Sequence, residues 1–189
     1  GHLELAITRG PQRNPVCIRT RLLVGADGWN SMVARWMGRG NSRGIATVSM
    51  DGEKRGHQED MVQVFVGRDM APGWFGWSIP LGGNRVRLGI GCDPEMTSLK
   101  PRYYFQQFRN SFPDVFDGLR PLSFSGGYIP LYRSNDGIPT YGDNALLVGD
   151  AARQVKPTSG GGIYTSIVAG GHAGRAACAA LASDDCSAA

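Results

Sequence analysis

The stretch "LLVGDAARQVKPTSGGGIYTS", residues 146–166, decides the fold. A short apolar run ends at Asp150, and three consecutive glycines at 160–162 stand where a long helix should begin. Each glycine weakens a helix by about 1 kcal/mol relative to alanine. Three together indicate that something lies closer to this backbone than a Cβ atom would allow.

The chemistry of this stretch favours a bound ligand. Asp150 follows a strand, where its carboxylate can accept hydrogen bonds from ligand hydroxyls, and Pro157 ends a local helix or turn. The first amides of a helix have no partner within it and carry the positive end of its dipole. We therefore expect an anionic or electron-rich planar ligand against residues 160–162. The alternative is a helix crossing eased by glycine.

A second strand-to-loop motif, "LLVGADGWNSMVAR", occupies residues 22–35. Gly28 permits a tight turn at the end of an apolar strand, and Asp27 or Asn30 can cap a helix that Gly38 ends. Ligands of open α/β sheets bind at such strand ends. The alternative is that Asp27 is only a helix cap.

Between the two motifs the sequence changes to short runs of period-two character. They predict antiparallel strands, with a helix at 101–112 and a hairpin turn at 81–84. The expected strands lie at 45–51, 60–67, 73–81, 85–93 and 122–131. Strands are also expected at 2–8, at 16–25 after a turn at 9–15, and at 143–150, with a buried Ala/Gly helix at 163–182.

The fold class is therefore mixed α/β: a partial Rossmann-like unit with an inserted antiparallel β-sheet domain. The expected domains are residues 1–42 and 136–189, which form the nucleotide-binding part, and residues 43–135, which form the insertion. The runs 22–24 and 146–148 are apolar, which is typical of strands covered by helices on both faces. This chain supplies few such helices, so we expect exposed residues there and an open cleft between residues 27 and 160.

Composition narrows the classes of function. Hydrophobic residues make up 41% and charged residues 19%, and the net charge is +4. The basic residues are scattered, which argues against nucleic acid as a partner. The four cysteines form no CxxC pair, so neither a metal site nor a disulfide framework is expected, and the default location is cytoplasmic. His172 and Arg175 argue against a membrane span at 163–182.

The two motifs in this order resemble the middle and C-terminal fingerprints of flavoprotein hydroxylases, and "KPTSGGGI", residues 156–163, resembles the geranylgeranyl reductase branch. The resemblance implies FAD as cofactor, with Asp150 on the ribityl hydroxyls and residues 160–162 facing the flavin pyrimidine. It places Asp27 near the pyrophosphate and Arg35 as a brace of that loop. The complete expected cofactor set is Asp27, Gly28, Arg35, Gly149, Asp150, Pro157, Gly160, Gly161, Gly162 and Ile163.

"FGWSIP", residues 75–80, resembles a Tyr-x-Trp-x-Phe-Pro signature that lines the lipid cavity of these reductases. It also resembles the Trp-x-Trp-x-Ile-Pro signature of flavin-dependent halogenases. In a strand, Phe75, Trp77 and Ile79 share one face and form the expected substrate pocket. The alternative is that this face is sheet core.

No GxGxxG motif for the ADP half of FAD is present, so an internal fragment of a longer flavoenzyme is expected. The resemblance implies hydride transfer from reduced flavin to an alkene of a lipid-like or other apolar substrate. NAD(P)H or another donor would supply the electrons, and peripheral membrane contact is compatible with such a substrate. No catalytic residue is selected among Tyr128, Tyr132 and Tyr164. A flavin monooxygenase or halogenase, and a non-catalytic half, remain as alternatives.

Overall fold

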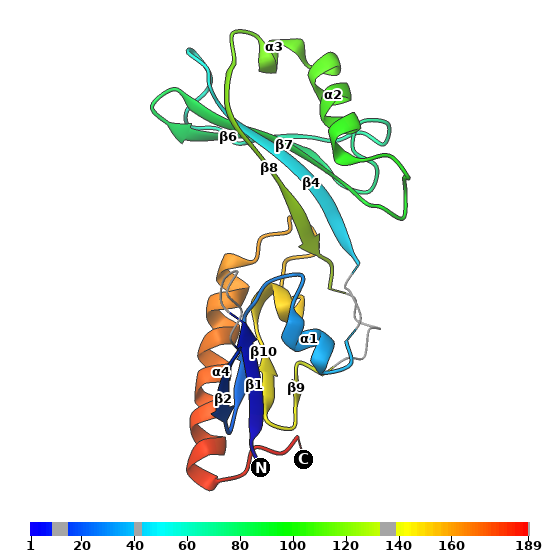
Figure 1. Cartoon of the computed structure of the whole chain (residues 1–189). Helices are drawn as coiled ribbons and strands as arrows, with labels where there is room; N and C mark the ends of the chain where they lie inside the picture. The colour runs from blue at the N-terminus through cyan, green and yellow to red at the C-terminus, as the bar shows by residue number, and fades with distance from the viewer. Residues whose placement is uncertain (9–14, 40–42, 133–138, 189) are drawn as a thin grey trace. The chain divides into compact units, whose positions relative to one another are not determined.

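The computed structural model describes residues 1–8, 15–39, 43–132 and 139–188 (Figure 1). It divides into two compact units, one of Gly1–Arg43 with Pro130–Ala189 and one of Gly44–Ile129. The expected turn at 9–15 and the expected domain boundaries at 42/43 and 135/136 fall on or beside residues outside the described ranges. Each unit is described by itself below.

The first unit contains a three-stranded sheet and a separate two-stranded ribbon. In the sheet, β3 (Leu23–Gly25) runs parallel to β10 (Ala145–Leu147), and β9 (Tyr141–Gly142) pairs with β10 antiparallel. The ribbon joins β1 (Leu3–Thr8) and β2 (Pro15–Thr20) antiparallel. A mixed fold with parallel strands at the two motifs is thus confirmed.

The prediction of one strand over 16–25 is wrong, because the chain changes pairing partner at Arg21. Strand β2 pairs with β1 up to Thr20, whose Oγ1 then donates to the carbonyl of Leu22 at 2.8 Å. Asn144 then bonds to the residues on both sides of Leu22. Its Nδ2 donates to the Arg21 carbonyl at 2.6 Å, and its carbonyl accepts from Leu23 N at 2.9 Å. The apolar run therefore forms two short strands instead of one.

The parallel strands are only partly covered, as expected. Val24 is 43% exposed, whereas Leu147 is 2% exposed and packs with Val33 and Ala151 in a small core. A groove of about 820 Å³ lies along β10 and α4 (Ile163–Ser183), with Leu146, Val148 and Val168 among its apolar walls.

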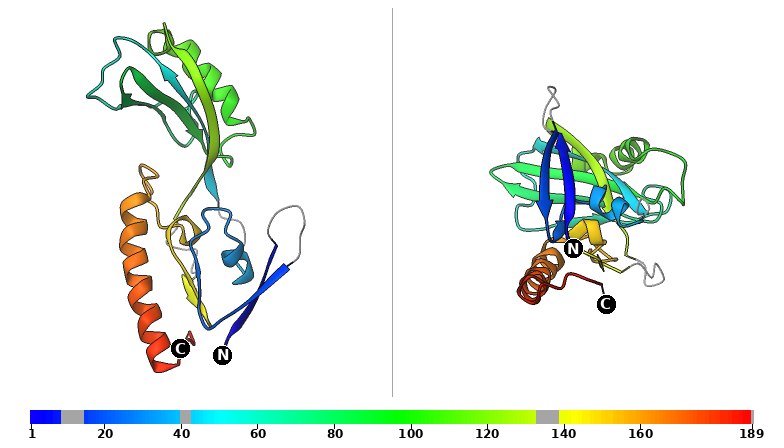
Figure 2. Two further views of the ribbon diagram at one scale, coloured as in Figure 1. Left: turned by 60° about the vertical axis from the view of Figure 1, so that its left-hand side comes forward. Right: turned by 60° about the horizontal axis from the view of Figure 1, so that its bottom comes forward.

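The prediction that the last helix is buried is wrong. No residue of α4 is buried, and Ile163 and Ile167 are 82% and 70% exposed. The helix lies along one side of the first unit (Figure 2). Partly buried positions recur along one face, at Ala169, Ala173 and Ala177 for example. The remaining faces have no covering element among the described residues. No helix within these ranges is long and apolar enough to cross a membrane.

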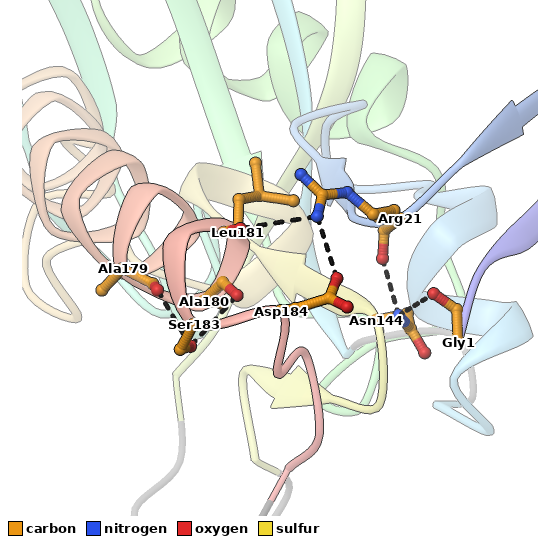
Figure 3. Close-up of polar contacts among 8 residues, drawn as sticks. All are labelled: Gly1, Arg21, Asn144, Ala179, Ala180, Leu181, Ser183 and Asp184. Atoms are coloured by element: carbon orange, nitrogen blue, oxygen red, sulfur yellow. Dashed lines mark hydrogen bonds and ion pairs between the residues drawn. The ribbon is translucent and has the colours of Figure 1, made fainter.

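The carboxyl end of α4 is tied to the start of the sheet (Figure 3). Arg21 Nη1 donates to Asp184 Oδ1 at 3.0 Å and to the carbonyl of Leu181 at 3.4 Å. The Ser183 hydroxyl donates to the carbonyls of Ala179 and Ala180, which lie in the last turn of the helix. The two bonds from Arg21 hold the helix end beside the residue at which the chain passes from β2 to β3.

The second unit is a five-stranded sheet in the order β5-β6-β7-β4-β8, with antiparallel pairing of β5 with β6, β6 with β7, and β7 with β4. The strands are β4 (Gly44–Glu53), β5 (Gln63–Phe65), β6 (Gly76–Gly82), β7 (Arg85–Cys92) and β8 (Arg120–Pro130). Gly82, Gly83 and Asn84 all have positive φ and close the predicted β6–β7 hairpin.

One face of this sheet is covered by helix α2 (Pro101–Ser111), followed by the short α3 (Pro113–Phe116) (Figure 1). Leu88 and Ile90 of β7 and Phe108 of α2 are fully buried in the core between sheet and helix. The predicted helix on an antiparallel sheet is confirmed.

Candidate functional site

Asp27 holds the start of helix α1 (Met32–Trp36). Its carboxylate accepts hydrogen bonds from Ser31 Oγ at 2.5 Å, from Met32 N at 2.7 Å and from Val33 N at 3.4 Å. Burial would raise the pKa of Asp27, but these hydrogen bonds outweigh it and leave the pKa below its usual value. This carboxylate is therefore engaged by its own helix.

The helix cap differs from the expected one. The N-cap is Ser31, whose Oγ accepts from Ala34 N at 2.9 Å. Asp27 accepts from the amides of Met32 and Val33. Asn30 accepts instead from Arg35 Nη1 at 3.3 Å, which keeps the Arg35 side chain close to the loop before the helix. Serine fits this position because its hydroxyl can accept from an amide three residues on while donating to Asp27.

Asp150 lies directly beyond β10, at the start of a short 3-10 helix, Gly149–Ala152. Gly149 has φ of 63°, and its amide donates to Gln154 Oε1 at 2.8 Å, which fixes the turn. Among the described residues, none donates a hydrogen bond to the Asp150 carboxylate. Burial raises the pKa of this carboxyl group. Asp150 is thus a partly buried acceptor that its own chain leaves available.

The glycine turn before α4 is closed by its own backbone. Gly160 N donates to the Lys156 carbonyl at 2.9 Å, and Lys156 N donates to the Gly161 carbonyl at 3.1 Å. Gly160 has φ of 68°, a conformation that strains any other residue. Gly162 is the N-cap of α4 and has no side chain that could cap the helix, so the first amides have no partner within the helix.

A cavity of about 620 Å³ brings the two motifs together. Of the predicted cofactor residues, its walls include Gly28, Gly149, Asp150, Gly160, Gly162 and Ile163. This cavity is the expected opening between the loop at residue 27 and the glycines at 160. Asp27, Arg35, Pro157 and Gly161 do not line it.

The walls also contain residues that the sequence did not single out: Ala26, Val148, Ser166 and Ile167. Ser166 lies one turn after Gly162 on α4, and its amide donates to the Gly162 carbonyl at 2.8 Å. A Cβ atom on Gly149 would lie 3.0 Å from Ser166 Oγ. Helical spacing from the glycines was the signal that could have indicated Ser166.

In the second unit, the predicted row of Phe75, Trp77 and Ile79 lies on the face of the sheet opposite α2. The alternating residues Gly76 and Ser78 are buried, and a Cβ on Gly76 would lie 3.6 Å from the Phe108 ring of α2. The ring centroids of Phe75 and Trp77 lie 6.2 Å apart in an edge-on arrangement, and both side chains remain partly exposed. The rings therefore do not form the core under the helix.

This face of the sheet continues from Trp77 onto β5. The Cα partner of Trp77 on that strand is Val64, which is 57% exposed. On the neighbouring strand β7, the Cα partner of Ile79 is Arg87. Arg87 Nε donates to Asp51 Oδ1 at 2.6 Å, and its Nη2 donates to Asp51 Oδ2 at 2.8 Å. Directly opposed residues share one face of a sheet, so Val64 extends the apolar row and Arg87 borders it.

The fold is shared with flavin-dependent enzymes. A flavin-dependent brominase variant aligns with a TM-score of 0.72 at 15% identity, over 99% of this chain and 53% of its own. A flavin-dependent halogenase aligns with a TM-score of 0.61 at 15% identity, over 90% of this chain and 32% of its own. At such identities the likeness shows a shared fold alone: a mixed α/β architecture with an inserted antiparallel sheet.

Sequence similarity relates the chain to one family of reductases. Residues 45–129 match the model of the geranylgeranyl reductase catalytic domain. A digeranylgeranylglycerophospholipid reductase of Methanosarcina mazei is 33% identical, over 90% of this chain and 42% of the relative. A second one, of Methanopyrus kandleri, is also 33% identical, over 90% of this chain and 45% of the relative.

The structural match agrees with this assignment. A geranylgeranyl bacteriochlorophyll reductase-like protein of Thermoplasma acidophilum aligns with a TM-score of 0.82 at 25% identity, over 93% of this chain and 45% of its own. By sequence and by structure, the chain is similar to geranylgeranyl reductases. It spans less than half the length of the curated relatives it matches.

Proposed function

We propose that this chain is part of an FAD-dependent oxidoreductase that reduces carbon–carbon double bonds of an isoprenoid lipid. The observation that carries the proposal is the cavity that joins Gly28, Asp150 and the glycine start of α4 in one unit. The sequence similarity supports the reaction type, because the two named relatives are digeranylgeranylglycerophospholipid reductases.

The residues of the cavity fit a flavin. The Asp150 carboxylate can accept hydrogen bonds from the ribityl hydroxyls, since no described residue of the chain occupies it. Gly162 leaves open the position next to that carboxylate, because a Cβ there would lie 3.2 Å from Asp150 Oδ1. The uncapped amides of α4 offer partial positive charge to an electron-rich ring edge.

The other predicted cofactor residues support the site indirectly. Asp27 orients the loop that contains Gly28 by binding the amides of Met32 and Val33. Pro157 and Gly161 belong to the turn that presents Gly160 and Gly162. Arg35 bonds to Asn30 on the same loop. We propose that these four residues shape the site without lining the cavity.

When bound, reduced FAD supplies a hydride to one carbon of the alkene, and a proton completes the other carbon. The chain's own part is to hold the flavin through Asp150 and to present an apolar surface to the lipid through Phe75, Trp77 and Ile79. No described residue is selected as the proton donor. His57 Nδ1 lies 2.7 Å from the Lys54 carbonyl and His172 Nδ1 lies 3.2 Å from Arg175 Nη2, so both rings have local partners.

The experiment is an anaerobic single-turnover assay with the full-length protein. The flavin is reduced with dithionite, a digeranylgeranylglycerol phospholipid is added, and the products are analysed by mass spectrometry. The proposal predicts lipid-dependent reoxidation of the flavin and products that gain two hydrogens per reduced bond. Flavin that stays reduced with the lipid until oxygen is admitted, and then gives a hydroxylated or halogenated product, would favour the monooxygenase or halogenase alternative. A protein that binds no flavin would favour the non-catalytic one.

A further inference from the structure

The indole of Trp77 occupies the space above Gly89 on the neighbouring strand. The two residues are Cα partners in the β6–β7 ladder. A Cβ atom on residue 89 would lie 2.3 Å from Trp77 Cζ2, 2.4 Å from Cε2 and 2.7 Å from Nε1. Unbonded carbon atoms approach to about 3.5 Å, so no larger residue fits at 89 while the ring keeps this position.

Trp74 repeats the arrangement two residues along β7. A Cβ on Gly91 would lie 2.4 Å from Trp74 Cδ1 and 3.1 Å from its Cγ. Trp74 stacks on Phe75 at 4.9 Å between ring centroids, and Phe75 meets Trp77 edge-on. Three aromatic rings thus form a continuous layer on this face of the sheet.

The two glycines alternate with residues that form the core. Leu88 and Ile90, their neighbours on β7, are fully buried against the α2 side. Glycine within a strand lowers stability relative to alanine, because it gains no packing and loses more backbone entropy. Its presence at both positions under an indole indicates a requirement for the close approach of the rings.

We propose that Gly89 and Gly91 are positioning residues that let Trp77 and Trp74 lie close to the sheet and so set how far the apolar row of Phe75, Trp77 and Ile79 projects from it. This inference rests on the proposed function, in which Trp77 contacts the isoprenoid chain. An alanine at 89 displaces the indole outward, toward the bound lipid. The lipid then has less room on this face, although no apolar group is lost.

Gly89 gives the sharper test, because a Cβ on Gly91 would also lie 2.7 Å from Ile45 Cγ2 and disturb the packing there. We would measure binding of geranylgeraniol to the full-length, FAD-loaded protein by titration calorimetry, with the flavin oxidised so that no turnover occurs. Gly89→Ala should weaken binding about tenfold, with unchanged FAD content. Gly127→Ala is the matched control, since its Cβ would meet only Thr47 Oγ1, at 4.0 Å.

A double-mutant cycle shows whether the effect passes through the indole. In the Trp77→Ala background, Gly89→Ala should cause no further loss, because the ring it displaces is gone. Additive losses would overturn the inference, as would an unchanged affinity of Gly89→Ala alongside a weakened Trp77→Ala. If Trp77→Ala itself binds geranylgeraniol normally, the proposed pocket is wrong, and this result is separate from the role of Gly89.

Folding of the variants gives a second measurement. If Gly89→Ala fails to fold, the double variant Gly89→Ala/Trp77→Ala should fold, because the contact between the new Cβ and the indole no longer exists. Recovery of the folded protein in the double variant, measured by circular dichroism and by FAD content, supports the inference. Failure of both variants contradicts it, since the glycine would then serve the sheet itself.

Discussion

Asp150 Oδ1 lies 3.2 Å from the position that a Cβ atom on Gly162 would occupy. A side chain at residue 162 would therefore crowd the carboxylate that follows β10. This crowding gives a physical reason for glycine at that position. Asp150 and the start of α4 line one cavity.

Replacing Asp150 should reveal a conflict between cofactor binding and stability. Burial raises the pKa of this carboxyl group, so its ionisation opposes folding once the pH exceeds the unfolded value of 3.8. We expect Asp150→Asn to raise the thermal midpoint of the flavin-free, full-length protein near pH 7. This gain in the thermal midpoint should fade as the pH falls below 3.8, because Asp150 is then protonated in both the folded and the unfolded protein.

Asp143→Asn is the control for this experiment, because Asp143 is an exposed carboxylate of the same unit. Calorimetric midpoints across the pH range give the comparison. Equal midpoints for Asp150→Asn and the unmodified protein at every pH would show that the carboxylate is not destabilising in the empty site.

The hydrogen bonds of Asp27 to the start of α1 predict the opposite dependence of stability on pH. Its pKa is lowered in the folded chain, so it stabilises the start of α1 above pH 3.8, and this contribution is lost as the pH falls through the lowered pKa. Asp27→Ala should destabilise this helix start by about 1 kcal/mol. Hydrogen exchange at the amides of Met32 and Val33 measures the effect locally, with Asn30→Ala as the control. If Asp27→Ala leaves the exchange protection of these two amides unchanged at neutral pH, Asp27 does not cap the helix.

The aromatic row makes a prediction about turnover. Trp77→Ala removes a partly exposed indole from the face opposite α2, so reduction of a long geranylgeranyl lipid should slow at least tenfold while FAD loading stays normal. Tyr103→Ala is the control, because Tyr103 is an exposed aromatic residue of α2. Equal losses in both variants would show that the effect is not specific to the pocket.

The 189-residue chain alone should retain little FAD. The cavity residues reach the ribityl and ring parts of a flavin, and the sequence contains no GxGxxG turn for the ADP half. Gel filtration of the purified chain, followed by the absorbance of the released flavin, tests this expectation. Stoichiometric FAD after gel filtration would contradict it.

The sequence predicted the features that depend on local chemistry. The β6–β7 hairpin followed from glycine and asparagine at residues that adopt positive φ, and the start of α4 followed from the glycine run. The period-two pattern placed Phe75, Trp77 and Ile79 on one face of their strand, although it left open whether that face is a pocket or the sheet core. In each case the conformational preference of a few neighbouring residues decides the structure.

The features that it missed depend on distant partners. The break at Arg21 arises because Asn144, far along the chain, takes over the backbone pairing. The exposure of α4 could not be inferred from its Ala/Gly composition, since burial depends on which elements surround a helix. Ser166 entered the cavity only through the packing of α4 against Gly149.

The most direct test of the account is the FAD affinity of Asp150→Ala in the full-length protein, compared with Asp143→Ala. Loss of charge-assisted hydrogen bonds to the ribityl hydroxyls should cost about 1.5–3 kcal/mol, which weakens FAD binding by at least tenfold. Circular dichroism should show that both variants are folded. A folded Asp150→Ala protein that binds FAD as tightly as the unmodified protein would contradict the assignment of this cavity to flavin.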